Sequence, residues 1–165
     1  MVTVIVVTYN RAERLGLCLY ALGRQKDASF EVVVVDDGSS DVTPQVVRRF
    51  GEDAKMPVYY VWQQDIGFRL SAARNAGARL GHGDGFVFID ADILLKPTAL
   101  YAYSLMLAEN PDRAIGGYYK YLKGMVILPR DIDEWERLWK MQLPEVEIPQ
   151  HQYHCLLYTS PSPRD

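Results

Sequence analysis

Residues Phe30–Ser39 read FEVVVVDDGS, an apolar run that stops abruptly at two aspartates and a glycine. Four consecutive valines leave no polar position between them, which is typical of a strand buried on both faces of a parallel sheet. Three further segments have the same apolar character: Thr3–Thr8 (TVIVVT), Val58–Trp62 (VYYVW) and Phe86–Ile89 (FVFI). The sequence therefore predicts four strands in a mainly parallel sheet.

Helical patterns separate these strands. Residues 11–24 place Leu15, Leu19 and Leu22 at helical spacing, with Asn10 as the expected N-cap. Further helices are expected at 43–50, 70–80, 97–110 and 131–143, and weaker strands at 114–119 and 125–128. This alternation predicts one α/β domain of Rossmann-like architecture, with helices on both faces of the sheet.

The bulk composition narrows the class of protein. With 165 residues, 48% of them hydrophobic and 24% charged, the chain is long and apolar enough for a globular core. A net charge of −3 without a basic run argues against nucleic-acid binding. From the sequence we expect no membrane-spanning segment, no signal peptide and no disulfide framework in these residues. We expect a cytoplasmic protein, and membrane association through a further segment stays open.

The last eleven residues, Cys155–Asp165 (CLLYTSPSPRD), resemble the translation of a transposase-type sequencing adapter. The alternative is a natural tail rich in Ser and Pro. The match runs through the whole segment in one frame, so we set this segment apart from the fold. We therefore expect an incomplete domain at residues 1–154, followed by a non-native tail, with the natural chain continuing beyond His154.

Polar residues collect where the predicted strands end. In an open parallel sheet, ligands bind in the crevice beyond the carboxyl ends of the strands. The polar segments are Thr8–Arg11 after the first strand, Asp36–Ser39 after the second, Gln63–Asp65 after the third and Asp90–Asp92 after the fourth. The sequence therefore predicts one ligand site at this edge of the sheet.

The pair Asp90 and Asp92 is the sharpest of these signals. Two carboxylates one residue apart at a strand end suit a hard cation such as Mg²⁺ or Mn²⁺, together with a ribose hydroxyl or a metal-bound water. The alternative is an Asx turn that closes the strand. Asp36 and Asp37 leave a similar choice, between a turn and a group that distinguishes uracil from cytosine.

Cationic and aromatic residues flank these acids. Arg69 precedes the predicted helix 70–80, where a helix N-terminus and a guanidinium both favour phosphate. Arg74 and Asn75 lie near the same helix start, and Arg74 has the alternative of a surface ion pair. For Tyr9 we expect one of two roles: to stack on a nucleobase or to cover the edge of the sheet. The three histidines, His82, His151 and His154, are taken as surface residues.

Four segments, in this order and spacing, resemble family 2 glycosyltransferases of the GT-A fold. They are VTVIVVTYNRAERLGLCLYAL, VVVVDDGSSD, GFRLSAARNAGARLGHGD and FVFIDADILLKP, which together span Val2 to about Pro97. The resemblance implies an inverting enzyme that moves a sugar from a nucleotide-diphosphate donor, typically a UDP-sugar, to a hydroxyl of a saccharide or other acceptor. It also implies Mg²⁺ or Mn²⁺ as the cofactor.

The resemblance assigns roles to the residues of the nucleotide side. Thr8, Tyr9 and Arg11 would line the nucleobase, and either Asp36 or Asp37 would contact the uracil. On the phosphate side, Arg69 would approach the diphosphate, Asp90 would reach the ribose or a metal-bound water, and Asp92 would bind the metal.

The resemblance also requires a general base that deprotonates the acceptor hydroxyl. In the family this acid lies in the C-terminal half. Asp131, Asp133 and Glu134 fit a helix cap and its first turn instead, so no base is assigned. The alternatives are a nucleotide-binding module without transfer activity and a receiver-type signalling domain, whose acidic pair would follow the first strand. An oxidoreductase is disfavoured because no G-x-G-x-x-G follows the first strand.

Overall fold

The computed structural model describes residues 1–117 and the backbone of residues 155–158. Its sheet has the strand order β3-β2-β1-β4-β6-β5. The strands are β1 Val2–Thr8, β2 Phe30–Asp36, β3 Val58–Trp62, β4 Gly85–Asp90, β5 Ile115–Gly117 and β6 Cys155–Tyr158. The helices are α1 Ala12–Gly23, α2 Thr43–Asp53, α3 Leu70–Leu80 and α4 Ala99–Glu109. Residues 1–116 and the backbone of residues 155–158 belong to one compact unit.

The parallel core of the sheet is confirmed. Strand β1 pairs in parallel with both β2 and β4, and β2 pairs in parallel with β3. All the helices and strands predicted within the first 117 residues are present, with bounds that differ by at most a few residues. The strand expected at 125–128 and the helix expected at 131–143 lie outside the described residues. None of the described helices is long and apolar enough to cross a membrane.

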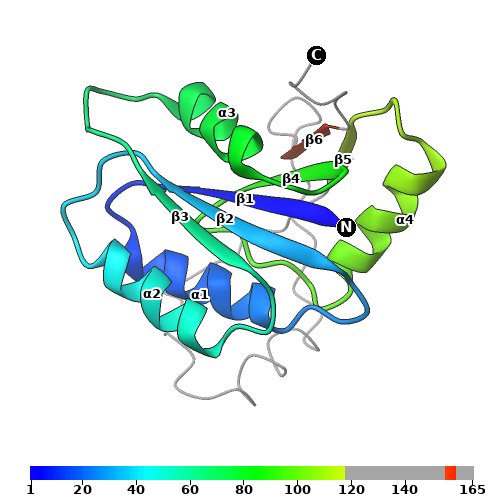
Figure 1. Ribbon diagram of the computed structural model, residues 1–165, viewed down its shortest axis with the longest axis horizontal. Helices are drawn as coiled ribbons and strands as arrows, with labels where there is room; N and C mark the ends of the chain where they lie inside the picture. The colour runs from blue at the N-terminus through cyan, green and yellow to red at the C-terminus, as the bar shows by residue number, and fades with distance from the viewer. Residues whose placement is uncertain (118–154, 159–165) are drawn as a thin grey trace, which may run out of the picture. The chain divides into compact units, whose positions relative to one another are not determined.

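Helices cover both faces of the sheet, with α1 and α2 on one face and α3 on the other (Figure 1). Alternate residues of β2 serve the two faces. Val32 and Val34 pack in the core shared with α1, α2 and α4, whereas Val33 and Val35 pack in the smaller core under α3. Because both faces are apolar, the strand shows no polar alternation, and this is why its valine run predicted a parallel sheet.

The start of α1 differs from the prediction. Asn10 is not the N-cap, because Arg11 occupies that position and makes no side-chain cap hydrogen bond. Asn10 instead adopts a left-handed conformation (φ 48°), and its Oδ1 accepts a hydrogen bond of 2.8 Å from the backbone N–H of Ser40. The N–H of Ala12 donates to Asp41 Oδ2 at 3.0 Å. A carboxylate from the neighbouring loop therefore satisfies the helix start.

Strand β6 lies in the segment that the sequence analysis set apart. It runs antiparallel to β4, with Phe86 opposite Tyr158 and Val87 opposite Leu157. An open strand edge offers backbone N–H and C=O groups to any extended segment, whatever its origin. The pairing adds an antiparallel strand that was not predicted, and the origin of residues 155–165 stays a prediction.

A buried carboxylate at the amino ends of the strands was not predicted. The Glu31 side chain on β2 is 2% exposed and accepts a hydrogen bond of 2.6 Å from Thr3 Oγ1. It also accepts from the backbone N–H of His82, and its Oε2 lies 3.2 Å from His82 Nδ1. His82 is exposed at the surface, as predicted, and in addition contacts this buried carboxylate. Burial favours a raised pKa for Glu31, but these hydrogen bonds lower the pKa below its usual 4.5.

The lowered pKa of Glu31 predicts a pH-dependent contribution to stability. A carboxylate with a lowered folded-state pKa stabilises the fold above its unfolded pKa, and that stability is lost as the pH falls through the folded pKa. Glu31→Gln should lower the free energy of unfolding by about 1–3 kcal/mol at pH 7. The difference from wild type should shrink below pH 4.5. Urea unfolding of both proteins at about pH 7, 5 and 3.5 measures this difference in the free energy of unfolding. A difference that does not change with pH would contradict the lowered pKa of Glu31.

Candidate functional site

Backbone pairing brings the ends of four strands to one edge of the sheet (Figure 1). The register places Thr8 beside Asp36 and Val7 beside Asp90. Hydrogen bonds continue across the strand ends, from Asp37 N to Thr8 O at 2.9 Å and from Ala91 N to Val7 O at 3.2 Å. The polar segments that the sequence predicted at one edge therefore do lie together there.

Asp36 closes the turn after β2. It is fully buried, and both of its carboxylate oxygens have partners within the protein. Oδ1 accepts a hydrogen bond of 2.7 Å from Ser39 N, and Oδ2 accepts one of 2.6 Å from the Tyr60 hydroxyl. Burial and the bond to Asp36 raise the pKa of Tyr60. These contacts give Asp36 the turn role that was one of the two predicted alternatives.

Asp37 joins the loop after β2 to the start of α3. Its Oδ1 accepts a hydrogen bond from Gln63 Nε2, and its Oδ2 accepts one of 3.1 Å from the backbone N–H of Arg69. The Arg69 guanidinium lies 3.7 Å from Asp37 Oδ1 and also donates to the carbonyl of Gln64. As predicted, Arg69 stands immediately before the helix, where it is the N-cap of α3. Asp37 thus holds Arg69 at the helix start.

The loops after β1, β2 and β3 pack closely on one another. The Tyr9 hydroxyl donates to Asp65 Oδ2 at 2.8 Å, while the exposed fraction of Tyr9 is 46%. This bond raises the pKa of Tyr9, and hydrogen bonds from Gly67 and Tyr9 lower the pKa of Asp65. Gly38 has a φ of 98°, and a Cβ there would lie 2.5 Å from the Asp65 backbone nitrogen. Only glycine fits this contact between the loops.

Three arginines contact the two carboxylates at the end of β4, Asp90 and Asp92. Arg11 Nη1 and Arg14 Nη1 lie 2.7 Å and 3.5 Å from the same oxygen, Asp92 Oδ2. Arg74 Nη2 lies 3.3 Å from Asp90 Oδ1, which is the surface ion pair expected as its alternative role. Arg11, assigned to the nucleobase by the resemblance, stands beside Asp92. Sequence reasoning missed Arg14, although it lies three residues after Arg11 and therefore on the same helical face.

The carboxylates at this edge of the sheet suit a cation only if a bound ligand supplies further oxygen atoms. Among the described residues, no three His, Cys, Asp or Glu side chains are grouped so as to hold a metal ion. Mg²⁺ is usually held by one or two carboxylates, with substrate phosphates and waters as the other ligands. Asp90 and Asp92 supply two carboxylates of that kind, and a ligand can reach them because their side chains are 55% and 35% exposed. They suit a cation that arrives with a diphosphate.

Two of the predicted residues have buried polar atoms without a partner. Within the part of the chain that the structure describes, the hydroxyl of Thr8, a residue that is 3% exposed, has no hydrogen-bond partner, and neither has Arg69 Nε. Buried polar groups are normally satisfied, so an unpartnered one at the end of a strand suggests a place for a ligand atom.

Asn75 is exposed on α3, next to Arg74.

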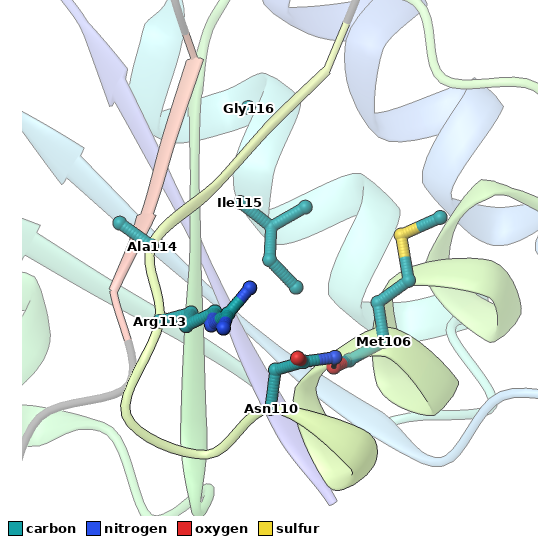
Figure 2. A pocket seen from close by; sticks show the side chains of 6 residues that line it. All are labelled: Met106, Asn110, Arg113, Ala114, Ile115 and Gly116. Atoms are coloured by element: carbon teal, nitrogen blue, oxygen red, sulfur yellow. Dashed lines mark hydrogen bonds between the residues drawn. The ribbon is translucent and has the colours of Figure 1, made fainter.

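A separate hollow of about 380 Å³ lies away from these residues, beside the end of α4 and the start of β5 (Figure 2). Its lining consists of Met106, Asn110, Arg113, Ala114, Ile115 and Gly116. None of the residues predicted for the site lines it. The candidate site is therefore the open edge of the sheet.

The chain is similar to known glycosyltransferases. The sequence profile described as "Glycosyl transferase family 2" matches residues 3–156. Hyaluronan synthase of Pasteurella multocida is 37% identical over 146 residues, which are 88% of this chain and 15% of that protein. The chain thus spans only a small part of this relative's length.

Solved structures share the fold. The structure of S. aureus TarS 1-349 in complex with UDP-GlcNAc is 27% identical, with a TM-score of 0.64 over 74% of this chain and 35% of that one. The mannosyltransferase PcManGT from Pyrobaculum calidifontis, in complex with GDP-Man and Mn²⁺, is 32% identical, with a TM-score of 0.64 over 72% of this chain and 35% of that one.

The close packing of the site loops predicts unequal effects of two glycine substitutions. Gly38 and Gly67 have φ values of 98° and 99°, so alanine at either position costs about 1–2 kcal/mol of backbone strain. A Cβ at Gly67 meets open space, whereas one at Gly38 meets Asp65. Gly38→Ala should therefore cost about 1–3 kcal/mol more than Gly67→Ala in urea unfolding. Equal losses would show that the two loops do not pack as described.

Proposed function

Because the chain belongs to glycosyltransferase family 2, we propose that it forms the donor-binding part of a hexosyltransferase-type enzyme. The enzyme transfers a sugar from a nucleotide-diphosphate donor, a UDP-sugar, to a hydroxyl of a saccharide or other acceptor, with inversion. The observation that carries the proposal is the meeting of Thr8, Asp37, Arg69 and the Asp90–Asp92 segment at one edge of the sheet. This edge is where parallel sheets bind nucleotides.

The nucleotide side is formed by Thr8, Tyr9 and Asp37. Thr8 offers an unpartnered hydroxyl, and Tyr9 offers an exposed ring. Of the two aspartates after β2, Asp37 is the better candidate for the uracil, because Asp36 is fully buried whereas Asp37 is 6% exposed. Both oxygens of Asp37 have partners within the protein, and an ionised carboxylate can accept further hydrogen bonds beside them. TarS was solved with UDP-GlcNAc, which supports a nucleotide-sugar donor for a chain of this fold.

The phosphate side is formed by Arg69, Asp90 and Asp92. Arg69 stands at the N-terminus of α3 with an unpartnered Nε, a position that suits a diphosphate. Asp92 and Asp90 would hold Mg²⁺ or Mn²⁺, and Asp90 also suits the ribose; the Mn²⁺ in PcManGT supports this choice of ion. When bound, the cation neutralises charge that develops on the departing diphosphate. Asn75, exposed on α3, completes the proposed donor-binding set.

Transfer with inversion needs a general base, and we assign this role to none of the described residues. The base would take the proton from the acceptor hydroxyl as that oxygen attacks the sugar carbon. Asp131, Asp133 and Glu134 lie outside the described residues. We therefore place the base in a further C-terminal segment, with residues 1–154 as an incomplete domain, residues 155–165 as a non-native tail, and this chain inactive by itself.

A nucleotide-binding module without transfer activity is the second candidate. The grouping of polar residues at one edge of the sheet favours this candidate as well. All the residues proposed to bind the nucleotide-sugar lie in the first 92 residues, and none of them acts as the general base. Both candidates predict donor binding by this chain. They differ only in catalysis by the longer protein.

The metal assignment predicts coupling between Mn²⁺ and UDP. Mn²⁺ should strengthen UDP binding to the wild-type chain by roughly 5–150-fold, the usual range for coupled ligands. Asp92→Asn should abolish this gain. The control is Asp84→Asn, because Asp84 is 92% exposed and pairs with the N-terminal amine at the other end of β4. Calorimetry that finds equal, metal-independent UDP binding in wild type and Asp92→Asn would exclude the assignment.

The nucleobase assignment predicts a change in selectivity. Asp37→Asn should reduce the preference for UDP over CDP by about ten-fold or more, since it reverses a hydrogen-bonding position in a buried contact. Asp36→Asn is the matched control, and it should weaken both nucleotides in the same proportion because Asp36 supports the turn. Competition binding with UDP and CDP measures both ratios. An unchanged ratio in Asp37→Asn would remove Asp37 from the uracil contact.

A further inference from the structure

The two proposed metal carboxylates already have positive partners. Arg11 and Arg14 both contact Asp92, and Arg74 contacts Asp90. Three guanidinium groups and two carboxylates give this group a formal charge of +1 (3 − 2). The Cys18 thiol adds no charge, because burial, with the negative field of Asp92 and Asp90, raises its pKa. The ion pairs thus more than neutralise the two carboxylates, which weakens their attraction for a dication.

The position of the arginines is not explained by helix stability. Arg11 is the N-cap of α1, and Arg14 lies in its first turn. A positive charge at a helix N-terminus opposes the helix dipole, which favours acidic groups there. Both arginines nevertheless contact Asp92, at 2.7 Å and 3.5 Å from the same carboxylate oxygen. Their position is thus better accounted for by Asp92 than by the helix dipole.

We infer that Arg11 and Arg14 act as an internal counter-ion on Asp92 and give way only when a diphosphate arrives. This inference rests on the proposed function, in which Asp92 is a metal ligand. A diphosphate that enters first offers the arginines a better partner, because guanidinium groups bind phosphate through paired hydrogen bonds. It also reverses the sign of the local charge, since two negative charges exceed the +1. Asp92 then becomes available to a cation.

The exposure of the side chains allows this exchange. The Arg11 and Arg14 side chains are 53% and 62% exposed, and Asp92 is 35% exposed. Solvent-exposed ion pairs contribute little stability, so breaking them costs little. The arginines therefore make cation binding depend on the diphosphate. The diphosphate binds first or together with the cation, and the cation alone binds only weakly.

The test is calorimetry on the whole chain with MnCl₂ alone, UDP alone, and MnCl₂ at saturating UDP. In the double variant Arg11→Gln/Arg14→Gln, Mn²⁺ alone should bind about three- to ten-fold tighter than in wild type. UDP alone should bind more weakly in this variant, because two phosphate-binding groups are lost. The strengthening of Mn²⁺ binding by UDP should shrink accordingly, since the coupling is reciprocal. Opposite changes for the two ligands cannot arise from partial unfolding, which weakens both.

The control is Arg48→Gln, which removes an exposed arginine paired with Glu52 on α2 and should change neither affinity. If Mn²⁺ alone binds the double variant no tighter than wild type, while Asp92→Asn still abolishes the gain from Mn²⁺, the counter-ion role is overturned and the metal assignment stands. If Asp92→Asn leaves Mn²⁺ binding unchanged with and without UDP, the metal assignment fails and the inference fails with it.

Discussion

The parallel pairing of β1 with both β2 and β4 is the constraint on which the candidate site depends. It sets Thr8 level with Asp36 and Val7 level with Asp90, so that three strand ends present their polar residues at one height. A slip of one residue in either pairing would turn these side chains to the opposite face of the sheet. The valine run does not prevent such a slip, because both of its faces are apolar and a shift would exchange one valine for another. The buried hydrogen bond from Thr3 to Glu31, which lie opposite each other on β1 and β2, does distinguish this register from the next. The position of the site therefore depends on polar partners at the amino ends of the strands as well as on the apolar cores between the strands and helices.

Much of this framework could be predicted from the sequence because it depends on local signals. The bounds of β3 and α3 agree with the prediction at both ends, since apolar runs and helical spacing mark them clearly. The edge at which the site lies also follows, because in a parallel sheet all carboxyl ends point the same way. The meeting of the Asp37 carboxylate with the backbone of Arg69 is a consequence of this geometry.

What the sequence could not predict are the partners of individual side chains. Asp36 and Asp37 are chemically identical neighbours, and only the conformation of the turn gives Asp36 the bonds to Ser39 and Tyr60. The contact of Glu31 with His82 joins residues 51 positions apart, for which no local pattern exists. The cap of α1 comes from a neighbouring loop for the same reason. Arg14 is different, because its spacing from Arg11 was a visible signal once one of them was assigned to the site.

Burial divides the four aspartates of this edge into two kinds. Asp36 and Asp37 are buried, and their oxygens accept hydrogen bonds from backbone N–H, hydroxyl and amide groups that are themselves fixed by the fold. Withdrawing such a partner would leave a buried charge unsatisfied, so these contacts persist with or without a ligand. Asp90 and Asp92 are exposed, and their carboxylates contact long arginine side chains among the described residues. Water can replace those partners at little cost, and so can a phosphate or a cation. The buried pair, Asp36 and Asp37, thus maintains the shape of the loops. The exposed pair, Asp90 and Asp92, can exchange its arginine partners for a ligand that enters the site.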